Sequence, residues 1–160
     1  MNAKSADLKQ SFEAAGFSDV KTVLASGNVV FSATARSIEE LARRAEAGMS
    51  RVMGRSFLTI VRSIDELAAL LEADPHERFR PAPNAKRVVT FLLEPPKARL
   101  SLPLEVDGAR ILSVKGCEVF TAYVPSPRGP VFMKLIQDSF GKDVTTRTWD
   151  TIKKVVRAGQ

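Results

Sequence analysis

The amino-acid sequence predicts an α+β protein made of two small lobes, and three observations carry this prediction. The 160 residues are 44% hydrophobic, which supplies enough apolar surface for a packed core. Apolar residues at helical spacing alternate along the chain with short valine-rich runs that are typical of strands. A stretch containing several prolines separates two such series. We therefore expect a first lobe over 1–74, a connector over 75–86, and a second lobe with a C-terminal helix over 87–160.

The first lobe is expected to open with a helix and a hairpin. An apolar stripe predicts a helix from about Ser5 to Ala15. The segments Val20 to Leu24 and Asn28 to Ala33 are rich in valine and are predicted to be strands. Gly27 stands between them and permits the positive φ of a tight connection. The two strands therefore form a predicted β-hairpin.

Two helices of the first lobe are indicated by serines with the spacing of a capping box. In this motif a serine accepts a hydrogen bond from the backbone three residues later. Ser37 predicts a helix to about Met53, and Ser63 predicts a helix that stops at Asp74-Pro75, because a residue before proline is pushed out of the α region. Between the two helices, Phe57 to Arg62 is predicted to be a strand.

The second lobe begins with a predicted buried strand over Arg87 to Leu93, a nearly continuous apolar run. A helix over Lys97 to Leu104 is an expectation that the proline at 103 disfavours. A second hairpin is predicted from Arg110 to Lys115 and from Glu118 to Val124. The proline-rich loop 125–130 then leads into a helix that ends at a glycine at 141.

The chain is expected to close with a strand over Val144 to Arg147 and a helix over Trp149 to Arg157. This helix has an apolar side and a basic side. The apolar side carries Trp149, Ile152 and Val156, and the basic side carries Lys153, Lys154 and Arg157. We therefore expect Trp149 to be buried and Thr148 or Thr146 to cap the helix.

The order of elements predicts two ferredoxin-like lobes. The first lobe has the order α-β-β-α-β-α and the second β-α-β-β-α-β-α, so that the two nearly repeat one another if the first is missing its N-terminal strand. The order β-α-β-β-α-β belongs to the ferredoxin-like split βαβ motif. Its opening strand lies inside the sheet. The first lobe is therefore expected to show an open inner sheet edge, or an element from elsewhere in the gap.

Two segments carry a resemblance to a known family. They are Val20-Lys21-Thr22-Val23-Leu24-Ala25-Ser26-Gly27-Asn28-Val29-Val30-Phe31, led by Gly16-Phe17-Ser18-Asp19, and Thr145-Thr146-Arg147-Thr148-Trp149-Asp150-Thr151-Ile152. Both resemble motifs of the bacterial family catalogued as domain of unknown function 1697. The resemblance implies two linked α+β lobes, no established enzyme activity and no established cofactor. This chain departs from the family pattern in two ways: Thr148 and Asp150 replace two asparagines, and the chain begins after the opening strand of the family.

The positive net charge of the chain suggests an anionic partner. Lys and Arg outnumber Asp and Glu by 24 to 18, which favours contact with polyanions if the excess is focused on one face. The leading hypothesis is a non-enzymatic domain that binds an anionic partner, such as nucleic acid or another polyanion. Its candidate anion-binding residues are Arg147, Lys153, Lys154, Arg157 and the turn Ser26, Gly27, Asn28. Arg147 could instead pair with Asp150. Two alternatives stay open: a small-molecule enzyme with a site between the lobes, including Arg147 and Ser26, and a structural or regulatory interaction protein.

Several chemistries find no support in the sequence. His76 is the only histidine and is expected to be a solvated residue of the connector, so no Ser-His-Asp triad or histidine-containing zinc site can be assembled. Cys117 is the only cysteine and cannot form an intramolecular disulfide. No phosphate-binding glycine motif and no apolar run long enough to cross a bilayer occurs. We expect a cytoplasmic protein with no catalytic residue, metal, cofactor or membrane contact assigned.

Overall fold

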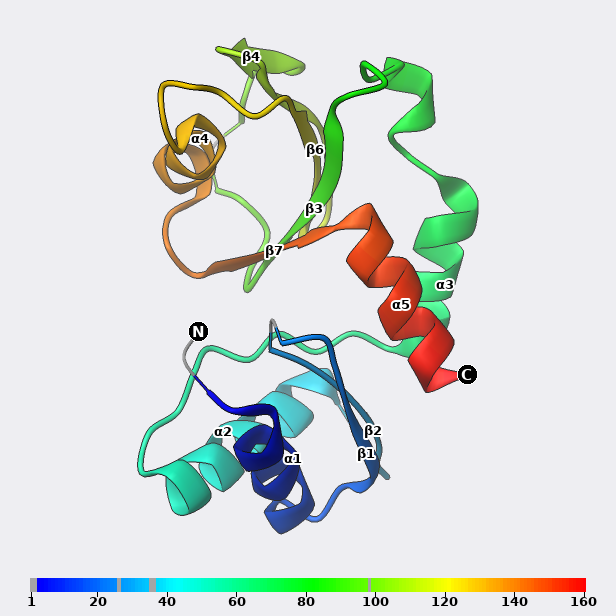
Figure 1. The fold of residues 1–160 in the computed structure, drawn as a ribbon, viewed down its shortest axis with the longest axis vertical. Helices are drawn as coiled ribbons and strands as arrows, with labels where there is room; N and C mark the ends of the chain where they lie inside the picture. Colours follow the sequence, from blue (N-terminus) through cyan, green and yellow to red (C-terminus); the bar gives the residue numbers. More distant parts are fainter. Residues whose placement is uncertain (1–2, 26, 35–36, 98) are drawn as a thin grey trace. The chain divides into compact units, whose positions relative to one another are not determined.

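The computed structural model describes residues 3–25, 27–34, 37–97 and 99–160, which form an α+β protein (Figure 1). The chain divides into two compact units. The first comprises residues 1–69 and 153–160, and the second comprises residues 70–152. Within the described residues there are five α-helices, one two-stranded sheet and one five-stranded sheet, both antiparallel.

The first unit contains the predicted helix and hairpin. Helix α1 (Ser5–Ala14) is followed by strands β1 (Ser18–Val23) and β2 (Asn28–Ser32), which pair antiparallel, and then by helix α2 (Ile38–Met53). Gly27 between the strands has a φ of 78°, as the tight connection requires. The core of this unit is formed by six buried residues from α1, α2, the hairpin and the residue just before it: Leu8, Phe12, Phe17, Val20, Ala45 and Met49.

The two helices of the first unit cross closely at Gly48. A Cβ atom at this position would overlap the backbone carbonyl oxygen of Ser11 and would lie 3.1 Å from the Cβ of Ala15. Beside the crossing, Nη2 of Arg44 donates a hydrogen bond of 3.1 Å to the carbonyl of Ala15 at the end of α1. The same guanidinium lies 4.6 Å from the ring centre of Phe17. Arg44 thus places a positive charge at the negative end of α1.

Both predicted serine caps are confirmed. The N–H of Glu40 donates to Oγ of Ser37 at 3.2 Å at the start of α2. At the start of α3 (Ile64–Ala73), the N–H of Glu66 donates to Oγ of Ser63 at 3.1 Å. Each bond satisfies one of the N–H groups that a helix leaves without an internal acceptor.

The predicted strand over Phe57 to Arg62 is wrong, because this segment joins neither sheet. The N–H of Thr59 donates to the Glu46 carboxylate at 3.2 Å, and the Thr59 hydroxyl donates to the carbonyl of Phe57 at 3.0 Å. A strand needs a neighbour to which its backbone can bond. The sheet of the first unit has two strands among the described residues, so residues 1–62 do not complete a four-stranded sheet.

The second unit is built on an antiparallel sheet with the strand order β4-β5-β6-β3-β7. Its strands are β3 (Lys86–Leu92), β4 (Leu104–Val106), β5 (Ala109–Lys115), β6 (Glu118–Tyr123) and β7 (Val144–Thr148). The hairpin of β5 and β6 is as predicted. Strands β3 and β6 lie inside the sheet, and their central residues are buried.

Helix α4 (Val131–Phe140) covers one face of this sheet (Figure 1). The core beneath it is formed by seven buried residues: Val88, Leu92, Ala109, Ile111, Val119, Phe132 and Ile136. The predicted helix over Lys97 to Leu104 is wrong, since the described residues before Leu104 have no helical structure and Leu104 begins β4. Leu100 and Leu102 pack on the core of α4 instead.

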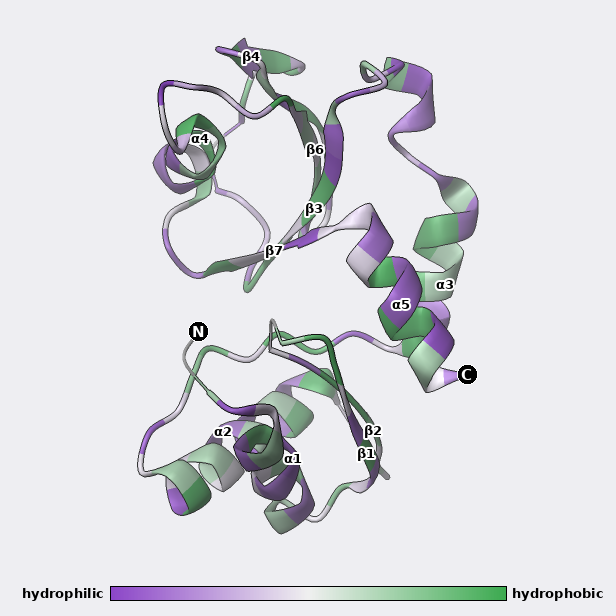
Figure 2. Ribbon diagram, viewed as in Figure 1, coloured by the Kyte–Doolittle hydropathy of each residue, from purple (hydrophilic) through white to green (hydrophobic). Residues whose placement is uncertain are grey.

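The last helix, α5 (Trp149–Gly159), is amphipathic as predicted. Trp149, Ile152 and Val156 are buried, whereas the lysines at 153 and 154 are exposed. Figure 2 shows hydrophobic and hydrophilic residues alternating along this helix. The N–H of Thr151 donates to Oγ1 of Thr148 at 3.3 Å, which confirms the predicted cap.

Candidate functional site

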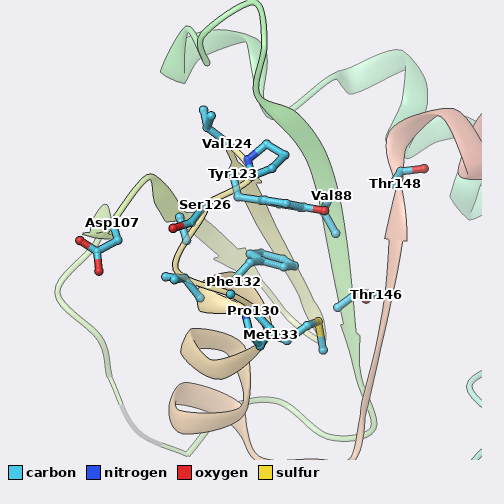
Figure 3. A pocket seen from close by; sticks show the side chains of 14 residues that line it. Val88, Asp107, Tyr123, Val124, Ser126, Pro130, Phe132, Met133, Thr146 and Thr148 are labelled. Atoms are coloured by element: carbon cyan, nitrogen blue, oxygen red, sulfur yellow. The ribbon is translucent and has the colours of Figure 1, made fainter.

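A cavity of about 320 Å³ lies in the second unit, beside the start of α4 (Figure 3). It is bounded by the ends of strands β6 and β7, by Val88 of β3, and by the loop 124–130 that leads into α4. All of its lining residues belong to the second unit, so its geometry is set within one compact body.

One wall of the cavity is aromatic. The ring of Tyr123, at the end of β6, stacks on the ring of Phe132, in the first turn of α4, with centroids 4.5 Å apart and planes inclined by 14°. Figure 3 shows the Tyr123 hydroxyl directed toward Val88. The ammonium group of Lys86 lies 6.0 Å from the Tyr123 ring centre. This wall offers a flat apolar surface with a hydroxyl at its edge.

The β7 side of the cavity carries two threonines. Thr146 and Thr148 alternate along the strand with Thr145 and Arg147, so they share the face on which α4 lies. Thr148 is opposite Val88 in the neighbouring strand β3. The Thr148 hydroxyl is engaged in the cap of α5, where it donates to Oγ1 of Thr151 at 3.0 Å and accepts from the N–H of Thr151 at 3.3 Å. The Thr146 hydroxyl can both donate and accept hydrogen bonds, so it suits a ligand edge with either kind of group.

Further polar groups lie where the loop meets α4. Ser126 accepts a hydrogen bond of 3.1 Å from the N–H of Arg128, whose guanidinium lies 3.8 Å from the Asp107 carboxylate. Helix α4 has no side-chain cap among the described residues, and its first internal bond runs from Lys134 N–H to the Pro130 carbonyl. The N–H groups of the first turn therefore have no acceptor inside the helix.

Arg147, predicted as an anion-binding residue, lies on the other side of β7 from these threonines. Its Nη1 donates to Oγ1 of Thr145 at 2.6 Å and to the carbonyl of Thr146 at 2.8 Å. Burial lowers the pKa of Arg147 from its ordinary value. The guanidinium is therefore used at least partly within its own strand, and its pairing with Asp150 stays a prediction.

The remaining predicted residues lie in the first unit. Lys153, Lys154 and Arg157 are exposed on α5. In the hairpin turn, Nδ2 of Asn28 donates to the carbonyl of Val23 at 3.0 Å, which gives Asn28 a structural role beside Gly27. Ser26 lies outside the described residues. Anion binding at this turn stays a prediction.

The prediction for His76 is wrong: this side chain is completely buried. Its Nε2 lies 3.2 Å from the carbonyl oxygen of Val88 and 2.9 Å from that of Thr121. The ring meets Phe120 and Trp149 edge to face, with centroids 5.9 and 5.1 Å away. Burial is the main cause that lowers the pKa of His76, which favours the neutral ring.

The described residues contain no group of three or more His, Cys, Asp or Glu side chains that could hold a metal ion. None of the helices in the described part of the chain is long and apolar enough to cross a bilayer.

The family and the fold are both shown by comparison with known proteins. Residues 1–120 match the model of the family described as protein of unknown function, DUF1697, and the chain belongs to this family. The predicted resemblance is thus confirmed, although the motif at 145–152 lies beyond the matched residues. Comparison with curated proteins finds no match.

Among solved structures, the chain is similar to the conserved bacterial protein SP0830 from Streptococcus pneumoniae. The match has a TM-score of 0.68 at 18% sequence identity, and it covers 99% of this chain and 90% of that chain. At this identity the similarity concerns the fold alone.

Proposed function

We propose that the chain is a ligand-binding protein whose site is the cavity of the second unit. The observation that carries this proposal is a hollow of about 320 Å³ with an aromatic wall and with Tyr123 and Thr146, which bear hydroxyl groups, among its lining residues. Its volume is at the lower end of the range of roughly 300–1,000 Å³ found for small-molecule sites, which are mostly apolar with a few placed polar groups. The ligand is therefore small and carries a planar ring.

The chemistry of the lining assigns a role to each wall. The ring of the ligand packs against Tyr123, whose position is fixed by stacking on Phe132. The hydroxyls of Tyr123 and Thr146 then bond to polar atoms at the edge of the ring, while the Thr148 hydroxyl keeps its bonds to Thr151. A heteroaromatic molecule with both donors and acceptors meets these conditions.

The proposal is tested with indole, which combines a planar ring with one N–H donor. Indole is titrated into the full chain while backbone amide resonances are followed by NMR. We expect shifts at Tyr123, Thr146 and Thr148. Replacing Tyr123 by Ala should weaken binding about tenfold, or ~1.4 kcal/mol, which is a typical energy for an aromatic pair. The variant Tyr123→Phe keeps the ring and should retain most of the affinity.

The control is Leu93→Ala, which removes an apolar side chain of the same unit that is 51% exposed and does not line the cavity. It should bind indole as the wild type does. Shifts confined to residues outside the cavity, or equal affinity in Tyr123→Ala and wild type, would contradict the proposal.

A second candidate function is binding of an anionic partner such as nucleic acid. It is favoured by Lys153, Lys154 and Arg157, which are exposed on α5 while the apolar side of that helix is buried. Positive groups along one helix suit the phosphates of a polyanion. A cytoplasmic location is part of both proposals, and the enzyme and regulatory alternatives stay predictions.

We also infer that the second unit is a ferredoxin-like lobe. When β4 is set aside, its sheet has the order β5-β6-β3-β7, in which the first strand along the chain lies between the third and the fourth. This matches the split βαβ motif with its first helix replaced by the irregular segment before β4. In the first unit, α1, β1, β2 and α2 follow the same order, and no strand precedes α1 among the described residues.

A further inference from the structure

His76 lies directly behind the wall of the cavity. It follows α3 and packs on the sheet, where its Nε2 is within hydrogen-bond distance of two carbonyl oxygens, on Val88 of β3 and Thr121 of β6. Val88 lines the cavity. The ring also contacts Trp149, the residue that follows the cavity-lining Thr148. His76 therefore contacts the backbone of Val88 on one side of the cavity and Trp149, the neighbour of Thr148, on another side.

The surroundings favour one charge state of this ring. Carbonyl oxygens only accept hydrogen bonds, so Nε2 carries the proton. The second nitrogen, Nδ1, is buried and has no hydrogen-bond partner among the described residues. A second proton there would be a charge without an acceptor in an apolar environment.

Two charged side chains act on the ring from the elements around it. Arg87 of β3 opposes a positive charge on His76, and Asp74, at the end of α3, favours one. The two side chains lie 3.6 Å apart and partly neutralise one another. Burial is the largest cause and lowers the pKa of His76 even though the hydrogen bonds to the carbonyls of Val88 and Thr121 raise it.

We propose that His76 is a positioning residue of the cavity: its neutral ring holds Val88 and the start of α5 in place, and proton uptake at Nδ1 puts a charge without an acceptor into this packing, which loosens it and weakens ligand binding. This inference rests on the proposed ligand-binding function of the cavity. It makes binding sensitive to acid through a group that does not line the site.

The first test measures stability and needs no ligand. Because the folded-state pKa is lowered, the unfolded chain takes up the proton first. The contribution of His76 is complete above the unfolded pKa of about 6.5 and declines as the pH falls below it. In that window the unfolding constant of the wild type should rise by up to about tenfold per pH unit on account of this group.

The matched variant is His76→Gln, whose side-chain amide can still donate to the two carbonyls but does not titrate in this range. Urea unfolding of both proteins at pH values from 7.5 to 5 should show a steeper loss in the wild type. Equal pH dependence in the two proteins would overturn the proposal.

The second test measures binding of indole, which is uncharged throughout this pH range. Its dissociation constant for the wild type should rise several-fold between pH 7.5 and 5, while that of His76→Gln should stay nearly constant. If indole does not bind in the cavity at any pH, the proposed function fails and the stability test still decides the role of His76. If indole binds with the same pH dependence in both proteins, the function stands and the role of His76 is refuted.

A third measurement is independent of any variant. Since His76 is the only histidine, the imidazole C–H resonances of the wild type belong to it alone. Their NMR titration should have a midpoint below 6.5. A midpoint at or above that value would overturn the proposal even if His76→Gln did not fold.

Discussion

Trp149 combines burial with a position at the first residue of α5. Its side chain is 8% exposed and packs edge to face against His76. Truncating a buried aromatic side chain removes its transfer free energy and leaves a cavity. We therefore expect Trp149→Ala to lower the free energy of unfolding by about 3–5 kcal/mol.

The measurement is urea unfolding followed by far-ultraviolet circular dichroism. Trp149→Phe is the matched control, because it keeps an aromatic ring at the site and should cost clearly less. A midpoint unchanged in Trp149→Ala would contradict the burial of this residue.

At the scale of single residues, the sequence predicted the role of those residues whose partners lie within a few positions along the chain. Ser37, Ser63 and Thr148 cap helices through bonds that span three residues, so spacing alone was sufficient. His76 could not be placed in this way, because its acceptors are 12 and 45 residues away. Tyr123 was missed as well, since only the fold brings its ring onto Phe132. A lone tyrosine ending an apolar strand was the one available signal.

At the scale of elements, α1 and α2 cross in close contact at Gly48. Alanine normally stabilises a helix interior by roughly 0.5–1 kcal/mol relative to glycine. Here the added Cβ would overlap the carbonyl oxygen of Ser11, and backbone atoms cannot move aside cheaply. We expect Gly48→Ala to destabilise the protein by about 1–3 kcal/mol, the usual cost of overpacking.

The comparison is Ala47→Gly on the exposed side of the same helix, which should destabilise only through helix propensity, by roughly 1 kcal/mol or less. Urea midpoints of the two variants provide the test. A stabilised Gly48→Ala protein would show that the helices are not in close contact at this point.

Elements were predictable where their own pattern was sufficient and failed where a partner was needed. The helices α1, α2, α3, α4 and α5 follow from periodicity and end signals that lie within each segment. Phe57 to Arg62 has the composition of a strand, but strand formation requires a paired edge that composition does not reveal. The segment from Lys97 to Leu104 contains proline and packs as an irregular stretch through Leu100 and Leu102.

At the scale of the whole molecule, the excess positive charge yields a prediction for the second candidate function. Neutralising three phosphates by Lys153, Lys154 and Arg157 should give a slope of log affinity against log salt of roughly −2.7 for duplex DNA. Replacing Lys153 and Lys154 by Gln should reduce the magnitude of that slope by about two. Retention of DNA at several salt concentrations is the measurement.

The control for this experiment changes the net charge by the same amount elsewhere. Lys97→Gln with Lys142→Gln removes two exposed lysines of the second unit and should leave the slope nearly unchanged. Equal slopes for both double variants would show that Lys153 and Lys154 make no specific contact with DNA and that the excess charge is only a solvated surface.

The α+β class and the family were predictable for the molecule as a whole, since element order and two motifs span most of the chain. The cavity was not. Its walls come from β3, β6, β7 and the loop before α4, segments that sheet pairing unites and that share no motif. The basic residues on α5 were visible in the sequence because they belong to one helix.

The distribution of chromophores across the two units has a practical consequence. The chain has a single tryptophan and a single tyrosine, Trp149 and Tyr123, and both belong to the second unit. Intrinsic fluorescence therefore reports on residues 70–152 alone, and the first unit emits only weakly through phenylalanine. Far-ultraviolet dichroism, in contrast, sees the helices of both units. Overlaying the two signals during one denaturation would therefore reveal, without any label, whether the two units unfold together.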